Sequence, residues 1–267
     1  MRYTTQRSWY LIVVALALML LATGPLAAAP PPTVTFNLTG VGSGANLAGV
    51  YTSPYTGNIN GGSSMGVICD DFADDSYVPE TWTAYVTSLS SVAAEGSPDT
   101  ILKWLTGVTP EAATETLTFG ATTYTLNQAQ AYTVAAVLAV DIMNAPTGSQ
   151  QQQDLSFSLW ELFDYSDAST ALNGYTSDQT NSLNYLNAAI MFASNSADAA
   201  EVKADVNATT IYSYDTGATG ACGGPCTAPQ EFLAVNMVEP PSPALLGLDL
   251  LAIGGLILFA RRRLKLT

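Results

Sequence analysis

The sequence contains no histidine, and its central region contains almost no basic residues. Without histidine, the chain cannot build a Ser–His or Cys–His nucleophile pair, an imidazole general base or the common zinc and copper sites. Six of the eight Lys and Arg residues lie in the two terminal segments, so only Lys103 and Lys203 remain between them. All acidic residues except Asp249 lie within residues 29–243, which together with these two lysines carry a charge of −19. A surface this acidic repels phosphate backbones and argues against nucleic-acid binding.

The N-terminal segment has the three-part pattern of a secretory signal peptide. Arg2 and Arg7 form a basic region, and an apolar run from Trp9 to Leu21 follows. Gly24-Pro25 then interrupts the run, and small residues at 27–29 provide a site for signal peptidase. We predict that residues 1–28 are removed on export, and that residues 29–236 form an extracytoplasmic domain.

The C-terminal segment, residues 237–267, predicts a membrane anchor. Residues 244–260 are apolar apart from Asp249, and as a helix they would extend about 26 Å, near the lower limit for crossing a bilayer. The basic cluster that follows predicts a cytoplasmic end, which leaves the central domain outside the inner membrane. This cluster contains Arg261, Arg262, Arg263 and Lys265.

This tail resembles a PEP-CTERM sorting signal, which consists of a Pro-Glu-Pro motif, a short Gly/Leu-rich helix and a terminal Arg cluster. Here the motif residues are Glu239, Pro240 and Pro241, and Val238 stands where the family has its first proline. Asp249 is a second departure, because the family has an apolar residue or Gly in the helix. The resemblance implies processing by an exosortase-type enzyme near the motif, followed by delivery from an inner-membrane-anchored precursor to the cell surface or the extracellular matrix.

Between the two ends, the order of predicted elements favours an α+β fold. Alternating apolar residues predict strands at 33–38, 64–69 and 81–89, and a hairpin is predicted at 115–125. Helices are predicted at 125–144, 150–163 and 177–193, and further strands at 209–214 and 230–237. We expect an antiparallel sheet or sandwich with a helical insert, in addition to the transmembrane helix. Capping boxes are predicted at Thr125/Gln128 and Ser149/Gln152.

Two groups of carboxylates are candidates for chemistry. The first is an acidic run that consists of Asp70, Asp71, Asp74 and Asp75. Calcium takes oxygen ligands, so this run could bind the ion, although a solvated loop is the simpler interpretation. Glu161 and Asp164 could form the acid pair of a glycoside hydrolase if they faced one cleft. For Glu161, the alternative prediction is a position at the edge of the core.

The three cysteines are predicted to be structural. Cys222 and Cys226 enclose a Gly/Pro-rich loop, and a local disulfide is the expected pairing in an exported protein. Cys69 ends an apolar strand, so we expect its side chain to be buried.

The blocks VICDDF (Val67 to Phe72) and LSFSLWELFD (Leu155 to Asp164) resemble the two blocks of bacterial thioester adhesion domains. In those domains a Cys is joined to a Gln four residues before a Trp. Ser156 occupies that position here, and Ser cannot supply the acyl group. The resemblance therefore implies a shared fold without the thioester activity.

Taken together, these patterns predict a non-catalytic surface or exopolysaccharide-matrix protein with a structural or adhesive role. The expected partners are signal peptidase, an exosortase-type enzyme, the membrane and exopolysaccharide, and no cofactor is expected apart from the calcium alternative. A calcium- or carbohydrate-binding module and a carboxylate-based hydrolase are the alternative hypotheses.

Overall fold

The computed structural model describes residues 32–72, 76–95, 102, 114–119, 122–215 and 229–236. Contacts divide the chain into residues 1–31 and 32–267, and every described residue belongs to the second unit. The predicted signal peptide, the sorting motif, the predicted span 244–260, the Arg cluster and the Cys222/Cys226 loop all lie outside the described residues. Within the described ranges, no helix is both long enough and apolar enough to cross a bilayer.

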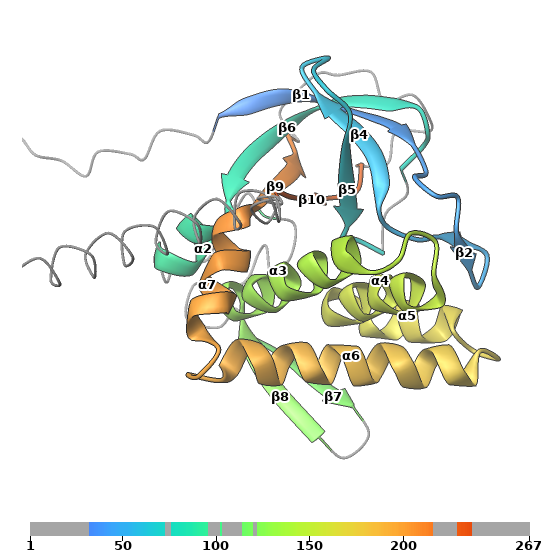
Figure 1. The fold of residues 1–267 in the computed structure, drawn as a ribbon, viewed down its shortest axis with the longest axis vertical. Helices are drawn as coiled ribbons and strands as arrows, with labels where there is room; N and C mark the ends of the chain where they lie inside the picture. Colours follow the sequence, from blue (N-terminus) through green and yellow to red (C-terminus); the bar gives the residue numbers. More distant parts are fainter. Residues whose placement is uncertain are drawn as a thin grey trace, which may run out of the picture. The chain divides into compact units, whose positions relative to one another are not determined.

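Six antiparallel strands close into a barrel in the order β1-β4-β5-β10-β9-β6 (Figure 1). The strands are β1 (Thr33–Gly40), β4 (Tyr55–Ile59), β5 (Met65–Cys69), β6 (Glu80–Ser88), β9 (Thr209–Tyr214) and β10 (Phe232–Val235). A small hairpin of β2 (Asn46–Leu47) and β3 (Val50–Tyr51) lies between β1 and β4 in the chain. The sequence predicts an antiparallel sheet or a sandwich, whereas six of the described strands form a closed antiparallel ring, and this ring has no free sheet edge.

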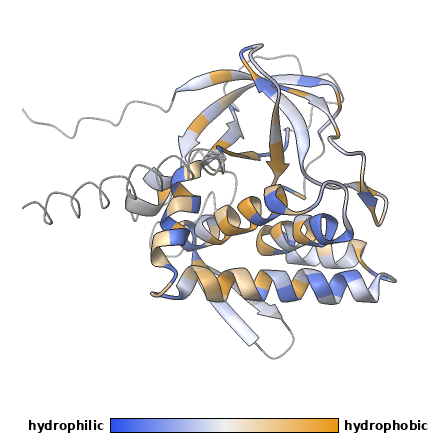
Figure 2. Ribbon diagram, viewed as in Figure 1, coloured by the Kyte–Doolittle hydropathy of each residue, from blue (hydrophilic) through white to orange (hydrophobic). Residues whose placement is uncertain are grey.

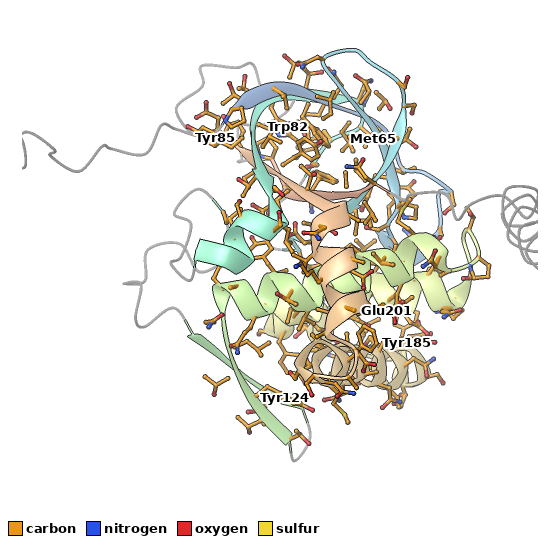
Figure 3. The ribbon with its side chains drawn as sticks, turned by 60° about the vertical axis from the view of Figure 1, so that its left-hand side comes forward. Met65, Trp82, Tyr85, Tyr124, Tyr185 and Glu201 are labelled. Carbon is orange, nitrogen blue, oxygen red and sulfur yellow. The ribbon has the colours of Figure 1, made fainter. Side chains whose placement is uncertain are left out.

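Alternate residues of the barrel strands point into the ring and fill it with aromatic side chains. Phe36 packs at ring-centroid distances of 4.7 Å from Trp82 and 5.4 Å from Phe232. Figure 3 shows Trp82 inside the ring of strands. Cys69 belongs to the same interior cluster. The barrel interior is therefore a packed core.

The helices are inserted between β6 and β9, together with a second hairpin. The helices are α2 (Leu89–Glu95), α3 (Gln128–Asn144), α4 (Gln150–Phe163), α5 (Tyr165–Ala171), α6 (Thr176–Ser194) and α7 (Ala199–Ala208). The hairpin strands are β7 (Thr114–Phe119) and β8 (Thr122–Asn127), in the region where the sequence predicts a hairpin. In Figure 1 this hairpin projects from the side of the helical layer opposite the barrel.

Helix α3 lies between the barrel and α6, which explains the almost continuous apolar run at 131–140. Its core cluster includes Leu233 and Val235, which β10 turns outward, whereas Phe232 and Ala234 of the same strand point into the barrel. All four residues of β10 are therefore buried. The N-cap of α3 differs from the prediction: Asn127 and Gln130 form the capping box in place of Thr125 and Gln128. The shift arises because β8 continues to Asn127.

Helix α6 changes in polarity along its length. Figure 2 shows that its first half is hydrophilic and its second half hydrophobic. The apolar half packs on the helical core, to which Leu186, Ala189 and Ile190 belong. The polar half lies beside α4, where Asp178 accepts a hydrogen bond from Gln150 Nε2 at 2.7 Å.

Candidate functional site

The two sequence blocks that resemble a thioester domain meet in the structure, where the end of β5 contacts α4. The indole Nε1 of Trp160 donates a hydrogen bond of 2.9 Å to the carbonyl oxygen of Cys69. Both residues are almost completely buried. We call the group formed by Ser53, Cys69, Ser156 and Trp160 the Cys69 junction.

Every polar group of Cys69 has a hydrogen-bond partner. Its thiol donates to the carbonyl oxygen of Asp71 at 3.0 Å, and its backbone N–H donates to Ser53 Oγ at 3.1 Å. Its carbonyl oxygen is held by Trp160. The side chain is therefore fixed by its own neighbours and is inaccessible to solvent.

Ser53 links Cys69 to the helix residue at the position of the thioester glutamine. Ser156 Oγ lies 3.5 Å from the carbonyl oxygen of Ser53 and donates a shorter bond of 2.9 Å to the carbonyl oxygen of Gln152. The Ser53 hydroxyl accepts the hydrogen bond from the backbone N–H of Cys69. The arrangement thus brings position 156 to the Cys69 junction, but the group there is a hydroxyl already bonded to backbone oxygens.

An aromatic cluster closes the junction on the side of the β2–β3 hairpin and α5. Trp160 packs edge-on against Phe157 at 4.9 Å and lies 5.1 Å from Phe72, measured between ring centroids. Leu47 and Leu172 complete the cluster. These contacts exclude water and fix the orientation of the indole that bonds to Cys69.

Beside the junction, a buried polar cluster joins the barrel to α3. Glu231 is fully buried, and its two carboxylate oxygens accept hydrogen bonds from the hydroxyls of Tyr132 and Ser213. Its carbonyl oxygen lies 3.5 Å from the backbone N–H of Asp70 across the β5–β10 ladder. Hydroxyl donors on two different elements stabilise this carboxylate and cross-link those elements.

Glu161 is a second fully buried carboxyl group, and neither of its oxygens has a hydrogen-bond partner. Burial raises its pKa from the ordinary 4.5 to about 8, and the Ser182 hydroxyl opposes part of this rise. That hydroxyl lies 3.1 Å from the carbonyl oxygen of Gln179, which is its hydrogen-bond acceptor. The expected position at the edge of the core is therefore wrong: Glu161 lies inside it.

The first two residues of the acidic run, Asp70 and Asp71, do not lie in the solvated loop that the sequence favours. Asp70 and Asp71 are both fully buried, because they continue β5 into the contact between the barrel and the helices. Asp74 and Asp75 lie outside the described residues. In the part of the chain that the structure describes, no group of three or more acidic or Cys side chains is arranged to hold a metal ion.

The Glu161/Asp164 pair has divided roles. Glu161 faces the protein interior, whereas Asp164 ends α4 and caps α5 by accepting from the backbone N–H of Asp167 at 3.4 Å. An open cavity of about 300 Å³ lies between β8, α3 and α6. Its lining contains no carboxylate and consists of Leu126, Gln130, Thr133, Val134, Ala193 and Ser194. This cavity therefore does not present the acid pair that a glycosidase requires.

Three further carboxylates come together where α7 packs on α3. Partial burial raises the pKa of Asp205 to about 6, and the charges of Glu201 and Asp141 add to this rise. Burial, with the Glu201 charge, also raises the pKa of Asp141. The sequence gives no indication of this group, because Asp141 lies about 60 positions before Glu201 and Asp205. Ser53 and Glu231 are missed for the same reason.

No protein-family model, curated protein or solved structure matches this chain. The resemblances to a PEP-CTERM signal and to thioester adhesion domains therefore rest on the residues quoted above.

Proposed function

We propose that this protein is an exported, non-catalytic surface or exopolysaccharide-matrix protein with a structural or adhesive role. A PEP-CTERM-like tail would direct it from the inner membrane to its final position. The observation that supports a non-catalytic role is the arrangement of the side chains at the Cys69 junction. The thiol is buried and bonded to Asp71, and a serine stands where a thioester domain has its acyl donor.

The sorting part is supported by the order of features along the chain. A signal-peptide pattern begins the sequence, and a Glu-Pro motif, an apolar segment and an Arg cluster end it. In this proposal the acidic body remains outside the inner membrane and contributes a soluble module to the cell surface. Its high negative charge keeps such modules apart from one another and from anionic polymers.

The test of sorting is the intact mass of the protein recovered from the native envelope and from the culture medium. We expect loss of both terminal segments, with the second cut near Glu239-Pro240. A mass that retains residues 244–267 in every fraction would refute exosortase-type processing and leave an inner-membrane-anchored ectodomain.

The test of the junction is the variant Ser156→Gln. If the layout is that of a thioester domain, the Cys69 thiol can attack the new carboxamide, forming a thioester and releasing ammonia. We expect the variant, and not the wild type, to show a mass lower by one ammonia, and the loss to disappear when Cys69→Ala is added. A folded Ser156→Gln variant with its full mass would contradict the relationship to thioester domains.

A further inference from the structure

Helix α4 is buried on two sides that have different chemistry. One side carries Ser156, Phe157 and Trp160 toward the barrel and α5. The other side faces α6, where Ser158 Oγ donates to the carbonyl oxygen of Ser182 at 2.8 Å. Glu161 lies one turn after Ser158 and next to Trp160. The Ser182 hydroxyl of α6 lowers its pKa, so Glu161 lies at the contact between α4 and α6.

The carboxyl group of Glu161 is compatible with this position only when it carries a proton. It has no exposed surface, and neither oxygen accepts a hydrogen bond. A buried ionised carboxylate without donors is costly, because it loses the solvation of water and gains nothing in exchange. Opening of the contact to water would remove that cost.

Among the residues that the structure describes, no other titratable group compensates the Glu161 charge. The elements packed against α4 are α3, α5 and α6, and Trp160 also contacts the end of β5. Their titratable residues are Tyr132 and Asp141 on α3, Tyr165 and Asp167 on α5, Asp178 and Tyr185 on α6, and Asp70 and Asp71 after β5. These are acids and phenols, and within the described residues none of them shifts the pKa of Glu161 by its charge.

We propose that Glu161 is a pH-sensitive switch at the contact between α4 and α6: the contact stays closed while the carboxyl carries a proton, and ionisation releases α4 and makes the Cys69 thiol accessible. The coupling to Cys69 is direct, since the indole of the neighbouring Trp160 donates a hydrogen bond to the carbonyl oxygen of Cys69. Displacement of α4 moves the indole and opens the Cys69 junction. The fold thereby contains an opening step that becomes more favourable as the pH rises from 4.5 to about 8.

The direction of the pH dependence follows from proton release. In the closed state Glu161 titrates at about 8, and in the open state it regains its ordinary value of 4.5. Below the lower value both states are protonated, and pH has no effect through this group. Between the two values the open state loses a proton that the closed state keeps, so the opening constant rises about tenfold per pH unit. Above the upper value both states are ionised, and the constant reaches a plateau.

The experiment measures the rate at which DTNB modifies Cys69 between pH 6 and pH 9. The full-length protein is used in detergent, with Cys222→Ser and Cys226→Ser so that only Cys69 reacts. Each rate is divided by that of the same protein unfolded in urea at the same pH, because the thiolate fraction also rises with pH. Glu161→Gln, which keeps the shape without the titration, is compared with the parent and with the matched control Asp164→Asn.

We expect the normalised rate of the parent to rise about tenfold per pH unit from pH 6 toward pH 8 and then to level off. Asp164→Asn should behave like the parent, and Glu161→Gln should show no such rise. Equal slopes in the parent and Glu161→Gln, or a flat parent profile, would overturn the proposal.

A second measurement separates local opening from complete unfolding. Local release of α4 exposes little surface, so low concentrations of urea should hardly change the parent rate at pH 8. A steep increase of the modification rate with urea would mean that Cys69 reacts only in the unfolded protein, and it would refute the proposed local opening.

Discussion

The contact between barrel and α3 and the contact between α4 and α6 each bury one glutamate, and they treat it in opposite ways. Glu231 receives hydroxyl donors from Tyr132 and Ser213, whereas the two oxygens of Glu161 receive none. Both side chains are fully buried. Burial alone therefore does not decide whether a carboxyl group supports a fold, since the donors brought to it by neighbouring elements set the sign of its contribution.

The largest effect is expected from Glu231→Gln. The amide replaces one acceptor oxygen by a donor, so one of the hydroxyls of Tyr132 and Ser213 loses its partner in a buried place. We expect a loss of about 3 kcal/mol in the free energy of unfolding at pH 7. Urea unfolding followed by circular dichroism measures it. A loss below about 1 kcal/mol would remove the contrast between the two glutamates.

The same substitution at the other site, Glu161→Gln, should stabilise the protein. At pH 8 the Glu161 carboxyl is ionised in the unfolded wild type. In the folded protein it must either take up a proton or remain ionised without hydrogen-bond donors, and both cost stability. We expect a gain of roughly 2–4 kcal/mol at pH 8 and almost none at pH 4, below the ordinary pKa of the carboxyl. Unfolding curves at both pH values test this. An equal gain at pH 4 and pH 8 would show that titration is not the cause.

A smaller loss of stability is expected from Trp160→Phe, which removes the hydrogen bond between α4 and the end of β5. The aromatic packing with Phe157 is largely kept, but the carbonyl oxygen of Cys69 loses its donor. We expect a loss of about 1–2 kcal/mol in the free energy of unfolding, together with faster modification of Cys69 at all pH values. Unchanged thiol reactivity would mean that the indole does not control access to the Cys69 junction.

The smallest effect is expected from Asp205→Asn at the contact between α7 and α3. Its pKa of about 6 is raised in the folded protein, so its ionisation costs stability as the pH rises through that value. Because the side chain is partly exposed, the variant should gain less than about 1 kcal/mol at pH 7 and nothing at pH 4. The gain should shrink in 1 M NaCl, since salt screens the charges of Glu201 and Asp141. A gain that is independent of salt would point to a cause other than charge repulsion.

Local patterns in the sequence determine most of the secondary structure of the described residues. The apolar run of α3 and the periodic Leu residues of α4 predict helices near their observed bounds, as do the alternating residues of β5 and β6 for strands. The position of Cys69 at the end of an apolar strand predicts its burial, and Cys69 is buried. Helix starts are less well determined, as the shift of the capping box from Thr125 to Asn127 illustrates.

The tertiary structure decides which strands pair and which polar groups meet. The closure of the barrel brings β10 between β5 and β9, although more than 160 residues separate β5 from β10, and no local pattern encodes such a pairing. The same closure places Glu231 against Tyr132, 99 residues away, and the packing of α4 on α6 leaves Glu161 buried without hydrogen-bond donors. The sequence alone identifies the apolar segments, the likeness of the two ends to export and sorting signals, and the serine at the thioester position. The environment of each carboxyl group depends on contacts between distant elements, and only the folded chain determines that environment.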